Sequence, residues 1–198
     1  MKYLTCPYFY LLFFLLPVWG RADHITGGEM YYSSLGVSNG NAGYQVTLRL
    51  LMRCNSGRMF PNPITVSVFS NGDNQRVMDI LVALTNQQQI SLGSYDPCIS
   101  NPPNVCYEVA EYFFPVSLPV NVAGYTMAAS VNFRVNGLAN LEQVGNVGAT
   151  YTADIPGSAV LASGEKNSSA RFTGSDLVVV CANSPFKYSF WGNRCRWG

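Results

Sequence analysis

Residues 43–54, with the sequence GYQVTLRLLMRC, alternate between apolar and polar side chains along almost their whole length. Leu51 is the exception, because it is apolar but falls on the polar side. A side-chain period of two is typical of a strand that buries one face and exposes the other. The stretch therefore predicts a half-buried β-strand, whose buried face consists of Tyr44, Val46, Leu48, Leu50 and Met52.

Similar patterns predict further strands. Residues 64–69 alternate in the same way, and the other candidates are residues 104–119, 124–135, 149–156 and 175–182. Residues 76–85 are apolar more continuously, which suggests a strand covered on both faces or a short helix. Asparagine with glycine, serine or proline marks turns between these stretches, at residues 39–40, 55–57, 71–73, 101–103 and 136–137. With no long amphipathic helical pattern, the chain is predicted to be all-β, an antiparallel β-sandwich that is immunoglobulin-like or jelly-roll-like.

The chain begins with the features of a secretory signal peptide at residues 1–22. Lys2 precedes the apolar run YFYLLFFLLPVW, and the small residues Gly20 and Ala22 fit cleavage after Ala22. That run is short for a membrane span, and no later stretch is apolar for long enough. We therefore expect an exported chain, secreted or at the cell surface, with no transmembrane segment in its mature part.

The remaining chain is interpreted as one β-sandwich domain over residues 23–186 and a tail over residues 187–198. Only 12% of all residues are charged and the formal net charge is +1, so no nucleic-acid partner is predicted. Glycine, asparagine, serine, threonine, valine and tyrosine are plentiful, which is typical of an extracellular β-protein.

The segment ADHITGGEMYY, residues 22–32, contains the only histidine, His24, five residues before Glu29. These two side chains could bind a metal or act as base and acid. One imidazole without a second histidine or an aligned nucleophile makes a poor site, however. We prefer a structural interpretation, in which Gly27 and Gly28 supply a bulge or bend before a strand over residues 29–35.

Two other sets of residues could carry chemistry. A glycosidase needs two carboxyl groups across a cleft, but Glu108 and Glu111 are three residues apart and point to opposite faces of a strand. An aromatic platform for sugars is conceivable, although core packing explains most of the aromatic residues: Tyr31, Tyr32, Tyr44, Tyr107, Tyr112, Phe113, Phe114, Tyr125, Phe133 and Tyr151. Residues 167–169 also match the N-glycosylation pattern.

Several stretches, taken in order, resemble one family. ADHITGGEMYYSSLG, YQVTLRLLMRCNSG, SYDPCISNPPNVCYEVAEYFFPVSLP, GATYTADIPG, NSSARFT and VVVCANSPFKYSF are similar to successive parts of large surface proteins of Bacteroidetes. These are described as gliding-motility-associated or PKD-domain-containing proteins and are often type IX secretion cargo. The resemblance covers residues 23–190. It implies a non-enzymatic module of a multidomain protein, in which His24, Gly27, Gly28 and Glu29 belong to the first structural segment.

The resemblance also bears on the cysteines, since the family usually carries two more after its GYT strand, where this chain has Asn132 and Phe133. If those two bond to each other in the family, the four cysteines Cys54, Cys98, Cys106 and Cys181 of this chain can pair among themselves. Sequence allows three connectivities for four cysteines. We prefer the pairs Cys98 with Cys106, across a proline-rich loop, and Cys54 with Cys181.

The tail SFWGNRCRWG differs from the family, which continues with an aspartate-rich turn. If one base is removed near Trp191, codons that can encode this tail can instead encode that aspartate-rich turn. We hypothesise that residues 191–198 are frame-shifted and the chain truncated. Cys195 would then not belong to the native set of cysteines. The alternative is a natural terminus.

The prediction is a non-catalytic, adhesin-like surface module without cofactor or metal, whose ligand is an unknown polysaccharide or protein. The alternatives are a carbohydrate-binding module and a glycoside hydrolase.

Overall fold

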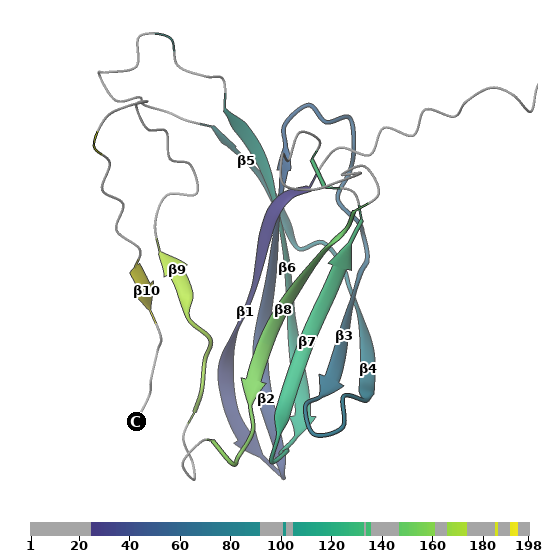
Figure 1. The fold of residues 1–198 in the computed structure, drawn as a ribbon, viewed down its shortest axis with the longest axis vertical. Helices are drawn as coiled ribbons and strands as arrows, with labels where there is room; N and C mark the ends of the chain where they lie inside the picture. Colours follow the sequence, from purple (N-terminus) through teal and green to yellow (C-terminus); the bar gives the residue numbers. More distant parts are fainter. Residues whose placement is uncertain are drawn as a thin grey trace, which may run out of the picture.

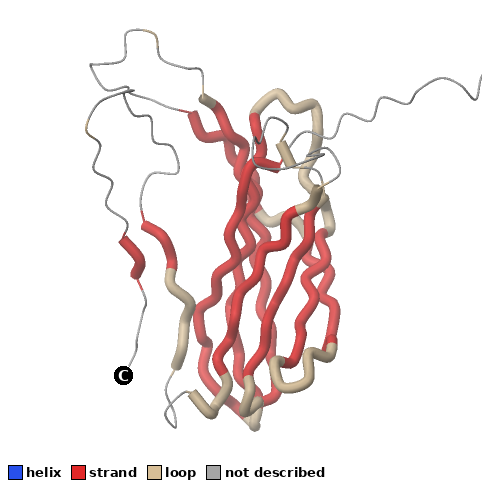
Figure 2. Tube along the Cα trace, in the orientation of Figure 1, coloured by secondary structure: helices blue, strands red, loops and turns tan. Residues whose placement is uncertain are grey.

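The computed structural model describes residues 25–91, 101, 105–132, 134–135, 147–160, 166–173, 185 and 191–193. In these residues every regular element is a β-strand (Figures 1 and 2). Two four-stranded antiparallel sheets face each other, so the predicted all-β antiparallel sandwich is confirmed. In the described ranges nothing is both long and apolar enough to be a membrane-spanning helix.

Each sheet combines strands from distant parts of the chain. The first sheet has the order β1 (Ile25–Ser38), β2 (Asn41–Arg53), β6 (Cys106–Pro119) and β5 (Asn86–Ser91). The second has the order β4 (Arg76–Val82), β3 (Ile64–Ser70), β7 (Gly124–Val131) and β8 (Ala149–Pro156). A separate ribbon pairs β9 (Arg171–Thr173) with β10 (Trp191–Asn193), so β10 lies in the predicted tail.

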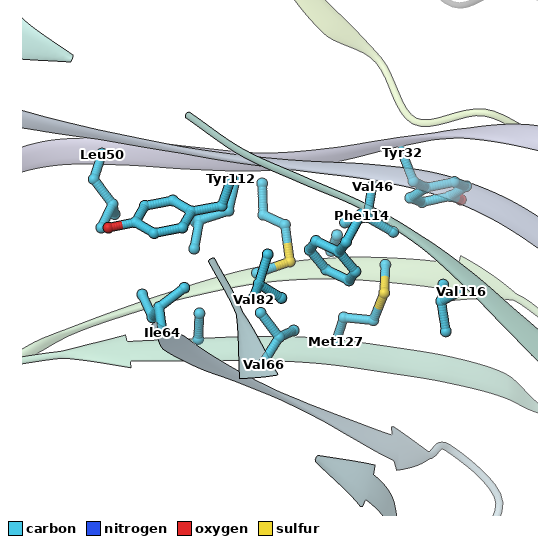
Figure 3. Packing of buried hydrophobic residues seen from close by; sticks show 14 of the residues in the cluster. Tyr32, Val46, Leu50, Ile64, Val66, Val82, Tyr112, Phe114, Val116 and Met127 are labelled. Atoms are coloured by element: carbon cyan, nitrogen blue, oxygen red, sulfur yellow. The ribbon is translucent and has the colours of Figure 1, made fainter. Parts of the chain in front are cut away.

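The core fills the space between the two sheets (Figure 3). The five residues of β2 predicted to be buried are all buried, and so are Ile64, Val66 and Val68 of β3. Side chains of β6 and β7 complete this layer, among them Tyr112, Phe114, Val116, Leu118 and Met127. The period-two alternation therefore predicted the core face of both strands correctly.

The turn at Asn39 and Gly40 is also confirmed. These two residues join β1 to β2 with φ angles of 51° and 77°, and Ser38 faces Asn41 across this two-residue turn. Both angles are positive, as the common two-residue hairpin turns with Asn-Gly require. Asn55 and Gly57, in the next predicted turn, are likewise positive, at 58° and 67°.

Residues 76–85 are not a helix or a strand covered on both faces, so that prediction was wrong. They contain β4, an edge strand with most of its side chains exposed, and the strand ends at Val82. The strand expected over residues 124–135 ends at Val131, whereas the strand at residues 149–156 matches β8. The strand expected over residues 175–182 lies outside the described residues.

The preferred disulfide pairs were also wrong. Cys54 bonds to Cys106, with their Cα atoms 5.4 Å apart, which leaves neither for Cys98 or Cys181. The reason is register: Arg53 of β2 faces Tyr107 of β6, so the next pair outward brings the two cysteines together. Cys98 and Cys181 themselves lie outside the described residues.

Candidate functional site

The segment singled out in the sequence, as far as the structure describes it, belongs to β1. His24 lies outside the described residues, whereas Gly27, Gly28 and Glu29 lie within the strand. The pairing with β2 shifts register between Ile25 and Gly27, so a bulge does lie next to the two glycines, but within β1 rather than before a strand over residues 29–35. A Cβ atom on Gly28 would lie 2.5 Å from the backbone oxygen of Arg49 in β2 and 2.9 Å from Cε1 of Tyr151 in β8, so this position needs a glycine for close packing between strands.

Glu29 belongs to a polar row that crosses the whole first sheet. Cross-strand pairing sets Glu29 of β1 opposite Arg49 of β2, Arg49 opposite Glu111 of β6, and Glu111 opposite Asn86 of β5. Arg49 alternates with the buried residues of β2, so the row lies on the outer face of this sheet. Each of the four strands therefore contributes one polar side chain.

Arg49 holds both carboxylates of the row. Its Nη1 lies 2.6 Å from Oε1 of Glu29, and its Nε lies 3.4 Å from Oε1 of Glu111. Asn86 donates from Nδ2 to Oε2 of Glu111 at 3.3 Å. The Arg49 side chain is only 14% exposed, so its charge is largely removed from water and its ion pairs are correspondingly less screened. Together the row carries two negative charges and one positive charge.

This geometry bears on the glycoside-hydrolase alternative, which a titratable cluster meeting Glu29 or Glu111 in space would support. The cluster exists, but Arg49 occupies the space between the two carboxylates. Their strands are two apart, which separates the backbones by about 10 Å at the usual strand spacing. A glycosidase instead places a sugar between its two carboxyl groups. The row is better suited to holding the four strands together and to presenting fixed hydrogen-bonding groups on the surface.

The second carboxylate pair is separated as the sequence predicted. Glu108 faces Met52 on the inner side of the first sheet, whereas Glu111 faces Arg49 on the outer side. Glu108 accepts a hydrogen bond from Nε2 of Gln87 at 3.0 Å. The two glutamates therefore belong to different faces and cannot act together.

Most of the predicted aromatic residues are structural. Tyr112 is fully buried, burial raises its pKa to about 12, and its hydroxyl donates to the Pro61 carbonyl at 2.6 Å. Burial also raises the pKa of Tyr44 and Tyr151. The other buried aromatic residues of the predicted set are Tyr32, Phe114 and Tyr125. Phe133 lies outside the described residues.

Among the described residues of that aromatic set, Phe113 is the most exposed, at 55%. Thr47 lies between Phe113 and Tyr31 on the outer face of the first sheet, one row from the charged side chains. The Tyr31 ring is covered by the Arg171 guanidinium, whose Cζ is 5.2 Å from the ring centroid. We call the set of Glu29, Tyr31, Arg49, Glu111 and Phe113 the outer-face patch.

Sequence reasoning found the two glutamates but gave Arg49 and Asn86 no role, because their proximity depends on strand pairing. Within the described part of the chain, no group of three or more His, Cys, Asp or Glu side chains is placed to hold a metal ion. Comparison of the chain with models of protein families, with curated proteins and with solved structures finds no match.

Proposed function

We propose that this chain is a non-catalytic extracellular β-sandwich module of a cell-surface or secreted adhesin-like protein. The observation that carries the proposal is the outer-face patch, in which the two carboxylates are held by Arg49 rather than poised around a reaction centre. Such a patch offers fixed polar groups beside the exposed Phe113 ring, which suits recognition.

The extracellular setting draws support from the Cys54–Cys106 disulfide, because such bonds persist mainly in oxidising compartments. It also draws support from the signal-like residues 1–22. The resemblance of residues 23–190 to Bacteroidetes surface proteins suggests that the module works within a larger protein of that kind. Expression of the full chain for export should yield a mature N-terminus at Asp23 and a bonded Cys54–Cys106 pair. Recovery of an unprocessed, reduced chain from the cytoplasm would contradict the proposal.

Adhesion itself is tested with beads coated with the exported chain. These beads should adhere to surfaces carrying polysaccharide or protein more strongly than beads coated with reduced and alkylated chain, because the fold presents the patch. Equal retention of native and alkylated beads on every surface would count against an adhesive role.

Phe113 favours one second candidate, a carbohydrate-binding module. Exposed aromatic rings stack on sugar rings, and neighbouring carboxylate and guanidinium groups can bond to hydroxyl groups. The chain should then be retained on insoluble cellulose, chitin or xylan, and Phe113→Ala should abolish retention while Val120→Ala does not.

The same incubation separates binding from hydrolysis. A binding module releases no reducing sugar from these polysaccharides. Release of sugar that is lost in both Glu29→Gln and Glu111→Gln would overturn the non-catalytic proposal in favour of a glycoside hydrolase.

A further inference from the structure

The four edge strands of the two sheets differ in how far other parts of the chain cover them. On β1, the Tyr32 amide donates to Oγ of Ser169 at 2.8 Å and the Ser34 amide donates to Oγ of Ser168 at 3.0 Å. The edge strand β8 lies against β1, where the Tyr32 hydroxyl donates to the Asp154 carbonyl at 3.0 Å. One side of the sandwich is therefore closed (Figure 1).

The other side carries the edges of β5 and β4. On β5 four of the exposed residues carry side-chain amides and the fifth is Ser91. Three of these amides bond to β6: Asn86 to Glu111, Gln87 to Glu108, and Gln89 to the sulfur of Cys106. Covering this edge would bury polar groups with little apolar gain. The β5 edge is thus suited to remaining exposed to solvent.

The edge of β4 is different because it is aliphatic. Val77 is 45% exposed, Met78 39% and Leu81 72%. Within the described residues β4 pairs with β3 on one side and with no strand on the other. The strand also has neither proline nor lysine, two residues that commonly protect an edge from pairing. Its open backbone and apolar side chains fit another extended strand.

A β-bulge makes the charges of β4 self-complementary. The register with β3 shifts between Val68 and Phe69, which puts Arg76 and Asp79 on the same outer face. There Nη1 of Arg76 lies 3.2 Å from Oδ2 of Asp79. Two antiparallel copies of β4 related by a two-fold axis at Met78 would set each Arg76 opposite the Asp79 of the other copy, because Val77 is the extra residue of the bulge and does not count in the register. An axis at Asp79 would instead oppose two like charges, which is unfavourable.

We propose that two copies of this chain associate edge to edge through antiparallel pairing of their β4 strands, which joins their second sheets into one. The interface is isologous, since the same strand serves both copies. Main-chain hydrogen bonds supply the pairing, and the Arg76–Asp79 contacts select the register. This inference does not depend on the proposed adhesive function.

The first test is the oligomeric state of the full chain, expressed for export and measured by sedimentation equilibrium over micromolar to submillimolar concentrations. We expect a reversible dimer. Met78→Lys should raise its dissociation constant at least about tenfold, because two lysines would then face each other at the two-fold axis. A wild-type chain that stays monomeric throughout would overturn the proposal.

The matched control lies on β1, the edge strand at the closed side of the sandwich. Val37→Lys changes an aliphatic residue that is 67% exposed there and should leave dimerisation unchanged. If this variant weakened the dimer as much as Met78→Lys does, the interface would not be the β4 edge.

A charge-swap mixture tests the register. Arg76→Glu and Asp79→Arg each break the ion pair within the chain and place like charges across the interface, so each variant alone should be monomeric. In an equimolar mixture, the introduced carboxylate of the first variant meets the introduced guanidinium of the second. The unchanged Asp79 of the first likewise meets the unchanged Arg76 of the second, so a heterodimer should form. A mixture no more dimeric than its components, from a wild type that dimerises, would rule out this pairing. Circular dichroism of both variants excludes unfolding as the cause.

Discussion

Arg49 shows how much one side chain depends on the alignment of its strand. Counting back from the Asn39–Gly40 turn, where Ser38 faces Asn41, a regular hairpin would set Glu29 opposite Leu50. A register shift between Ser34 and Gly36 moves the pairing by one residue. Glu29 therefore faces Arg49, and the outer-face patch exists because of this bulge.

Replacing Arg49 should show how much the fold is destabilised when the two carboxylates have no cation beside them. In Arg49→Met the side-chain volume is roughly kept, but Glu29 and Glu111 lose their shared cation. We expect the free energy of unfolding to fall by about 2 kcal/mol in urea denaturation, within the range for removing a partner of half-buried charged groups. The control is Arg53→Met on the same face of β2, which is exposed and should change stability by less than about 0.5 kcal/mol. Equal effects of the two changes would contradict a special role for Arg49.

Tyr112 should make the fold sensitive to alkali. Its pKa is raised to about 12 in the folded protein, whereas an unfolded tyrosine titrates near 10. Its contribution is fully present below pH 10 and is lost as pH rises toward 12, because the unfolded chain loses that proton first. The slope from this group is at most about 1.4 kcal/mol per pH unit. Urea denaturation between pH 8 and 11.5 should show a shallower decline for Tyr112→Phe; parallel curves would refute the assignment.

At the scale of elements, the fold protects β1 with a segment that is not itself a strand. Residues 167–169 supply hydroxyl groups and a backbone amide to Tyr32 and Ser34. The Asn167 amide nitrogen also donates to the Tyr32 hydroxyl at 2.9 Å. The glycosylation-like pattern noted in the sequence therefore has a structural use in covering a sheet edge.

Removing one hydroxyl should loosen this cover locally. In Ser169→Ala the Tyr32 amide loses its acceptor, so its hydrogen exchange should accelerate, and the stability should fall by about 1 kcal/mol. Ser33→Ala alters an exposed serine of the same strand and should leave the Tyr32 amide unchanged. Exchange followed by NMR or mass spectrometry checks both, and an unaltered rate in Ser169→Ala would show that the segment does not cover β1.

At the scale of the whole molecule, the Cys54–Cys106 bond encloses strands of both sheets. Its two cysteines are 52 residues apart, and β3, β4 and β5 lie between them. Closing so long a loop restricts the unfolded chain strongly, which stabilises the fold by about 4 kcal/mol on the chain-entropy estimate. The bond thus limits how far β3 to β5 can separate from β2 and β6 when the chain unfolds.

The double variant Cys54→Ser, Cys106→Ser should therefore lose about 4 kcal/mol of unfolding free energy in urea denaturation. Gln89→Ala removes only the side chain that contacts the sulfur of Cys106 and should cost less than about 1 kcal/mol. Peptide mapping without reduction should recover Cys54 linked to Cys106. A peptide joining Cys98 to Cys106 would contradict this connectivity.

Local patterns by themselves determined the strand class of this chain, the buried face of β2 and β3, the hairpin at Asn39–Gly40 and the bulge near Gly27. Each depends on a period of two or on the φ preference of one or two neighbouring residues, which the sequence carries directly. Only the tertiary structure decided that polar β5 is a strand, that apolar β4 lies at an edge, and that Cys54 meets Cys106. It also decided that Arg49 joins Glu29 to Glu111. These features depend on which strands become neighbours and in what register, and long-range pairing leaves no local periodic signal to read.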